Sequence, residues 1–307
     1  MATSDQTVTA KPLWLTTAPF VFLLFWSSGF TFAKLGLLYS EPMTFLALRF
    51  ALVLVVLAPL VLILRPRLPR RAADWGHLAV VGFLVQPIYF GLSYLSFASG
   101  VSAGAVALIV SLQPILVAIA APALAGERVN ALRWVGLLLG LAGAAIVIVA
   151  RSTIEAASVF GLVCAFVATF GMTGASLYEK RFGLNHHPVI ANLVQFTVGL
   201  AVILPLAYLS ESMVVVWNVE LMVSLGFLVI ANSLIAVSLL LAMIRAGEVS
   251  RVSALLFLVP PLAALLAWAV LGEQMPPLAW LGLAVAAAGV VLATRKMKEP
   301  AAPEANL

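Results

Sequence analysis

Long apolar stretches, separated by short polar breaks, run through almost the whole chain. A helix needs about 20 apolar residues to cross the hydrocarbon core of a bilayer. Measured with that length, the pattern predicts ten membrane-spanning helices, at roughly 13–36, 43–64, 76–98, 101–124, 132–150, 157–179, 189–209, 219–244, 249–271 and 277–294. Turn residues such as Glu41-Pro42 and His187-Pro188 mark the breaks between them.

Composition supports the same class of protein. Hydrophobic residues make up 64% of the 307 residues and charged residues only 9%, and the mean hydropathy is +1.14. A soluble domain carries about 25% charged residues. The sequence therefore predicts an all-α integral membrane protein with the lipid bilayer as its surroundings, because a helix satisfies its backbone hydrogen bonds internally.

The distribution of positive charge predicts an orientation. If the N-terminus is cytoplasmic, all but three of the 17 Lys and Arg residues fall in cytoplasmic segments; the exceptions are Lys34, Arg49 and Arg151. Positive charge concentrates on the cytoplasmic side of membrane proteins, so we expect both termini in the cytoplasm. The same distribution accounts for the pI of about 9.7 without a nucleic-acid partner.

A 32-residue segment occurs twice, at 112–143 and again 146 residues later at 258–289, with 14 identical positions. The matches include residues that rarely coincide by chance: Pro114/Pro260, Gly126-Glu127/Gly272-Glu273, Trp134/Trp280, Gly136/Gly282 and Gly143/Gly289. At the same offset Arg49 pairs with Gln195, and Gln86 with Asn232. Because each copy contains five predicted spans, the second must cross the membrane in the opposite sense, as an inverted repeat.

The predicted organisation has five parts. It consists of a cytoplasmic N-terminal tail, a first five-helix repeat, a linker, a second five-helix repeat and a cytoplasmic C-terminal tail, at 1–12, 13–150, 151–156, 157–294 and 295–307. Glycines in the fifth and tenth spans predict faces for close helix packing, with a homodimer contact as the alternative interpretation.

These features resemble the EamA-type members of the drug/metabolite transporter superfamily. The resemblance rests on WSSGFTFAK at 26–34, on Pro42 and Arg49-Phe50, and on the two Pro, Gly-Glu and Gly series of the repeat. It implies a ten-helix bundle with a central cavity lined mainly by spans one, three, four, six, eight and nine. It also implies export of amino acids or related compounds. Many members have glycine after the first-span tryptophan, where this chain has Ser27.

Polar residues inside the spans are the candidates for substrate contacts, because a polar group facing lipid is costly. We select Trp26, Ser27, Thr31, Gln86, Tyr89, Tyr94, Gln113, Thr173, Ser176, Asn232 and Ser233. The repeat brings Gln86 and Asn232 to comparable depths around a central cavity. The alternative interpretation is hydrogen bonding between helices, which is common within membranes.

Two charged residues lie within predicted spans. Arg49 lies about two turns into the second span, where a central arginine costs at least about 2.5–3.5 kcal/mol, so we expect a partner or an escape to the interface. Lys34 lies near the end of the first span and can extend to the interface more easily. Glu127 and Glu273 are interpreted as loop-capping charges.

Pro114 and Pro260 interrupt helices at repeat-equivalent positions and are candidate hinges, or static kinks. Enzyme and metal motifs are absent from the sequence, so we expect no catalysis, no cofactor and no metal. The leading hypothesis is a secondary transporter of small organic metabolites in a bacterial inner membrane, working by alternating access. The alternatives are an uncoupled facilitator or channel-like pore, and a membrane scaffold subunit that needs a partner.

Overall fold

The computed structural model describes residues 14–113, 115–117, 119–120, 131–152, 158–182, 186–237, 239, 243 and 259–294. Every named element in these ranges is helical, as the sequence predicted. The elements are α1 (Trp14–Gly36), α2 (Pro42–Leu64), α3 (Ala72–Phe83), η1 (Leu84–Gly91), α4 (Leu92–Ala98), α5 (Ala103–Val110), α7 (Ala131–Ser152), α8 (Val159–Phe182), α9 (Pro188–Ser210), α10 (Val219–Gly226), η2 (Phe227–Ala236), α13 (Val259–Leu271) and α14 (Pro277–Thr294).

Six helices in the described residues are long and apolar enough to cross a membrane. They are Thr17–Gly36, Pro42–Leu64, Ala72–Ala98, Val159–Glu179, Pro188–Ser210 and Val219–Ala236. Shorter apolar helices occupy Ala103–Val117, Trp134–Val147, Leu262–Leu271 and Pro277–Gly289. The protein is therefore a multi-pass membrane protein, and the total of ten spans stays a prediction.

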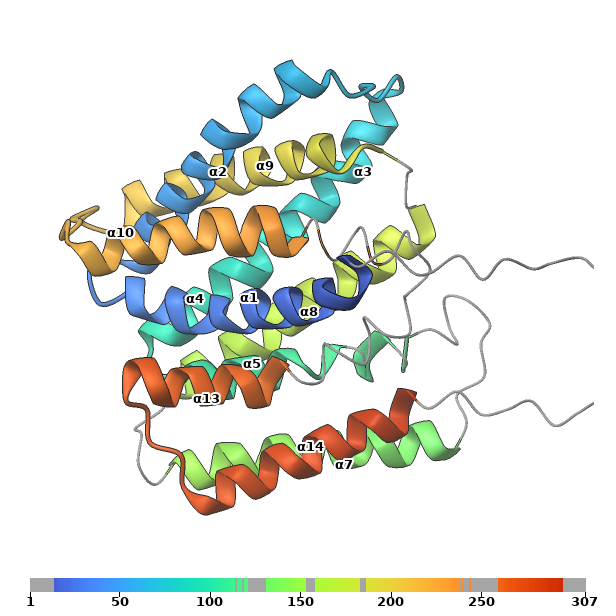
Figure 1. The fold of residues 1–307 in the computed structure, drawn as a ribbon, viewed down its shortest axis with the longest axis vertical. Helices are drawn as coiled ribbons and strands as arrows, with labels where there is room; N and C mark the ends of the chain where they lie inside the picture. The colour runs from blue at the N-terminus through green and yellow to red at the C-terminus, as the bar shows by residue number, and fades with distance from the viewer. Residues whose placement is uncertain are drawn as a thin grey trace, which may run out of the picture.

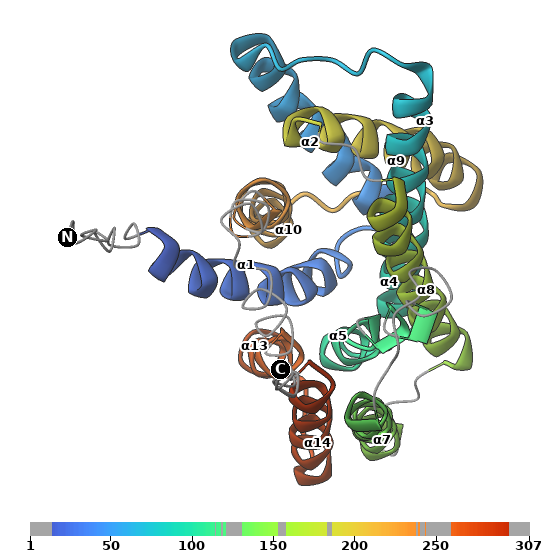
Figure 2. The same cartoon turned by 90° about the vertical axis from the view of Figure 1, so that its right-hand side faces the viewer.

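The helices lie side by side in a bundle (Figures 1 and 2). Its most extensive helix pair is α7 with α14, followed by α2 with α9. These pairs lie toward opposite ends of the long axis in Figure 1. Between them, α1 packs against α13 and η2, and α8 packs against η1 and α4. The middle of the bundle is thus formed by α1, α8 and the two π-helical segments η1 and η2.

Carboxylates hold the start of α2 against the end of α9. Glu211 accepts hydrogen bonds from the backbone N–H groups of Met43 and Thr44 and from the Thr44 hydroxyl, each at 2.7 Å. Glu41 in turn accepts from the N–H and hydroxyl of Ser212, at 2.8 and 2.6 Å. A carboxylate at a helix N-terminus satisfies free N–H groups and opposes the helix dipole. These reciprocal contacts fix the relative position of two neighbouring spans.

Glycines allow α7 and α14 to approach until their backbones touch. A methyl group added at Gly143 would overlap backbone atoms of Ala286 and Gly282. One added at Gly289 would overlap backbone atoms of Gly136 and Gly140. Small residues are the usual means of close helix contact within membranes. The glycine faces expected from the sequence therefore pack against each other within one chain; the homodimer contact stays a prediction.

We expect Gly143→Ala to lower the melting temperature of the detergent-solubilised protein. The added methyl has no free volume, and overpacking a close contact costs about 1–3 kcal/mol. The matched control is Gly76→Ala, because the same methyl on α3 meets no atom within 4 Å. Differential scanning fluorimetry of both variants checks this. Equal melting temperatures for the two would show that the α7–α14 contact is looser than described.

Candidate functional site

Two spans change helix type at the centre of the bundle. η1 separates α3 from α4, and η2 continues α10. Adding the repeat offset of 146 to η1 gives 230–237, which overlaps η2. Gln86 lies in η1 and Asn232 in η2. π-helical turns are rare and occur frequently at functional sites. Gln86 and Asn232, which the sequence offset pairs, therefore both lie in an irregular turn.

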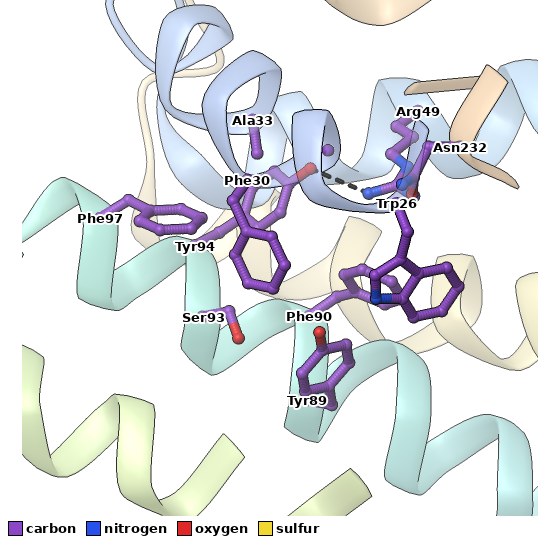
Figure 3. Close-up of a pocket in the computed structure, with 11 residues that line it drawn as sticks. Trp26, Phe30, Ala33, Arg49, Tyr89, Phe90, Ser93, Tyr94, Phe97 and Asn232 are labelled. Atoms are coloured by element: carbon purple, nitrogen blue, oxygen red, sulfur yellow. Dashed lines mark hydrogen bonds between the residues drawn. The ribbon is translucent and has the colours of Figure 1, made fainter. Parts of the chain in front are cut away.

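Two adjoining cavities lie beside these segments. The larger has a volume of about 180 Å³ and extends along η1, α8, α9 and η2 to Glu179 and Pro188. The smaller, of about 30 Å³, extends toward Ala33 and Phe97 (Figure 3). The two share part of their lining, namely Trp26, Arg49, Tyr89, Phe90 and Asn232. These shared residues mark the junction of the two cavities in the middle of the bundle.

Arg49 lies at this junction with only 2% of its surface exposed. Its Nη1 donates to the Tyr94 hydroxyl at 3.0 Å, and its Nη2 donates to Asn232 Oδ1 at 2.9 Å and Ser233 Oγ at 3.0 Å. The guanidinium also lies 4.7 Å from the centroid of the Phe90 ring, within the range of a cation–π contact. Arg49 therefore does not extend to the membrane interface; it is held inside by neutral partners from η1, α4 and η2.

Several residues selected from the sequence come together around Arg49. Trp26, Gln86, Tyr89, Ser176, Asn232 and Ser233 line the larger cavity, and Tyr94 joins the lining of the smaller one. Asn232 also donates to the carbonyl of Phe25 at 3.2 Å, which ties η2 to α1. The Oε1 atom of Gln86 is buried without a hydrogen-bond partner. Gln86 and Asn232 thus line the same cavity.

Other selected residues lie elsewhere. Ser27 and Thr31 are buried in α1 outside both linings. Thr173 donates to the carbonyl of Thr169 in its own helix at 2.7 Å, and Gln113 donates to Ser176 Oγ at 2.7 Å. The Gln113–Ser176 bond is the contact between helices that was given above as the alternative interpretation, whereas the Thr173 bond lies within one helix.

Of the two candidate hinge prolines, the structure describes Pro260. Pro114 lies outside the described residues. Pro260 is the second residue of α13, and the residues before this helix are outside the description. The hinge stays a prediction.

The described lining includes two helices beyond those that the resemblance implies. Among the described residues, α2 contributes Arg49 and α9 contributes Asn192 and Gln195, whereas α5 and α13 contribute none. α5 and α13 pack against each other instead. The described part of the lining therefore includes spans two and seven, while parts of spans four and nine lie outside the described residues. The sequence analysis missed Asn192 as a lining residue, although it is a polar residue inside an apolar span. It also missed Phe90, and no signal could have identified it because apolar residues occur throughout the spans.

An ion pair joins helix ends at the end of the bundle that lies away from Glu179. Lys34 Nζ lies 2.7 Å from Glu273 Oε1, with 22% and 7% of the two side chains exposed. The same carboxylate oxygen accepts from the backbone N–H of Ala103 at 3.1 Å. Glu273, interpreted from the sequence as a loop-capping charge, thus joins the ends of α1, α5 and α13. The larger cavity approaches the other end of the bundle, where α8 ends and α9 begins.

Known proteins are similar to this chain in sequence and in fold. A family model described as the EamA-like transporter family matches residues 13–149 and 159–295. The chain is 25% identical over 279 residues to the uncharacterized transporter YvbV of Bacillus subtilis (strain 168), covering 90% of each. It is 23% identical over 277 residues to the uncharacterized inner membrane transporter YedA of Escherichia coli (strain K12), covering 90% of this chain and 89% of YedA.

A solved crystal structure superposes on the chain with a TM-score of 0.62 at 19% identity. The superposition covers 91% of this chain and 96% of the other, so the similarity in fold extends over nearly the whole length of both.

Proposed function

Because the chain belongs to the EamA-like transporter family, we propose that this membrane transporter is a secondary transporter that carries a small organic metabolite by alternating access. Its expected cargo is an amino acid or a related compound, moved outward across a bacterial inner membrane. In this proposal two inverted five-helix halves enclose the cavity, and both termini are cytoplasmic.

The observation that carries the proposal is the asymmetry of the cavity. From Arg49 the larger cavity extends to Glu179, whose side chain is exposed at the end of α8. In the other direction lies the smaller cavity of about 30 Å³, and the Lys34–Glu273 ion pair lies beyond Ala33 in its lining. A binding space that is larger toward one end, with an ion pair between helix ends at the other, is consistent with one state of an alternating-access transporter.

Charge supports a cytoplasmic orientation for the Glu179 end. The connection between α2 and α3 lies at that end, on the right in Figure 1, and carries Arg67, Arg70 and Arg71. Positive residues concentrate on the cytoplasmic side. The described arrangement then corresponds to the inward-facing state, in which an exporter takes up its cargo.

Helix packing supports two equivalent halves. Two helix pairs that the repeat relates to one another are in contact: α2 with α9, and α7 with α14. Equivalent helices near a pseudo-twofold axis pack on each other, so these pairs are consistent with an axis through the middle of the bundle.

Counterflow in liposomes tests the proposal against its alternatives. We expect the purified protein, in vesicles loaded with unlabelled amino acid, to accumulate the labelled amino acid transiently, because a carrier exchanges cargo faster than it returns empty. A facilitating pore gives flux without this transient accumulation. A scaffold that needs a partner gives no flux. Protein-free vesicles are the control. If none of the amino acids, each tested alone, accumulates transiently in this way, the proposal is contradicted.

A further inference from the structure

We propose that Arg49 binds a carboxylate group of the cargo, which restricts the substrates to organic acids and zwitterions that carry a free carboxylate. This inference rests on the proposed transport function and names the substrate class of the same site. Its basis is a buried charge whose protein partners are all neutral.

Among the residues that the structure describes, none supplies a counter-charge to Arg49. A guanidinium stays protonated inside proteins, and its hydrogen-bond partners here are two hydroxyls and an amide, from Tyr94, Ser233 and Asn232. Of the described residues that line either cavity, Glu179 is the acidic one, and it makes no ion pair with Arg49. Buried charges in proteins are normally paired, so an anion that enters the cavity supplies the missing partner.

Symmetry indicates that this charge serves more than packing. The repeat places Gln195 on α9 at the position equivalent to Arg49 on α2, and Gln195 lies in the lining of the larger cavity too. The second copy thus folds with a neutral side chain at this position. An arginine in the first copy breaks the equivalence at the one place where the two cavities meet.

The guanidinium has donors to spare. Arginine carries five N–H groups, and three hydrogen bonds to protein leave two of them, including that on Nε, which has no partner. A carboxylate that accepts from one of them forms a charge-assisted hydrogen bond and supplies the opposite charge. Trp26, Tyr89 and Phe90 surround the same junction, so the rest of the ligand meets aromatic surface. The ligand is therefore a carboxylate with an apolar or aromatic body.

Binding of four matched probes to the purified, detergent-solubilised protein tests the assignment. The probes are phenylalanine, 3-phenylpropionate and the primary amides of both, so that the carboxylate and the ammonium vary independently while the shape is kept. We expect both acids to raise the melting temperature by mass action. Both amides are expected to bind roughly 10- to 150-fold more weakly, the factor that corresponds to a lost hydrogen bond to a charged group.

Variants connect this preference to Arg49. In Arg49→Gln the acids are expected to bind as weakly as the amides, and Arg49→Lys, which keeps the charge but not the guanidinium, is expected to be intermediate. Arg67→Gln is the control, because it removes the same charge from the exposed α2–α3 connection. If Arg49→Gln shows no cooperative melting, the wild-type comparison and Arg49→Lys decide the question.

Three results overturn the assignment: amides that bind the wild type as tightly as acids, an acid preference that survives Arg49→Gln, or no binding of either acid at millimolar concentration. The transport proposal fails separately. Liposomes that transport amines or amides as well as acids would keep the transporter and reject the Arg49 site. Acid-selective binding without any flux would keep the site and reject the transporter.

Discussion

Transport is expected to fall by roughly 100-fold or more in Ala175→Trp, because a ligand site needs an unfilled concave space. Ala175 lies on α8 in the wall of the larger cavity and is 3% exposed. An indole at this position projects into a space of about 180 Å³ that the cargo must occupy. The initial rate of counterflow in proteoliposomes measures the effect.

The matched control for this substitution is Val167→Trp. Val167 lies on the same helix, is 42% exposed and belongs to neither cavity lining, so the added side chain meets lipid. We expect its transport rate to stay close to that of the wild type. Both variants should melt within a few degrees of each other. Wild-type transport by a well-folded Ala175→Trp protein would show that cargo does not pass through this cavity.

The second large effect is expected from a covalent tether across the Lys34–Glu273 closure. Alternating access requires this end to open in every cycle, and a tether removes the open state from the equilibrium. Lys34→Cys and Glu273→Cys, joined by a reducible bifunctional thiol reagent, should therefore lower transport by roughly 100-fold, since the remaining state cannot release cargo. Reduction of the reagent should restore transport.

The tether experiment needs a protein without other reactive thiols. The chain has one cysteine, Cys164, and it is buried in α8, so Cys164→Ala provides the background. Each single-cysteine variant treated with the same reagent controls for modification alone. Cargo binding in detergent should persist in the tethered protein, because the larger cavity approaches the opposite end. Undiminished transport by fully tethered molecules would mean that this end does not open, and would reject alternating access.

Much of the candidate site was predictable because polar residues are rare within apolar spans. Gln86, Asn232 and Ser233 were selected on that ground, and they lie in one cavity lining. The same criterion also selected Thr173 and Gln113, which bond to other helices or to their own backbone. Rarity identifies a side chain that needs a polar neighbour, but it does not distinguish a neighbouring helix from a ligand.

The choice of lining helices was not predictable from the sequence. Most spans are apolar around their whole circumference, since lipid and neighbouring helices are equally apolar. A helix of that kind has no amphipathic stripe to indicate which face turns inward. Rotation about the helix axis, which sets whether Asn192 or Arg49 enters the cavity, therefore follows only from packing against neighbours.

The sequence by itself determined the class of protein and the helical character of its described elements. A membrane-spanning helix satisfies its hydrogen bonds within itself, so these properties depend on the length and composition of each local stretch. Tertiary structure decided that Arg49 meets residues 45 and 183 positions away and that Lys34 meets Glu273, 239 positions away. Such pairs depend on how helices cross and rotate, and no local pattern encodes this.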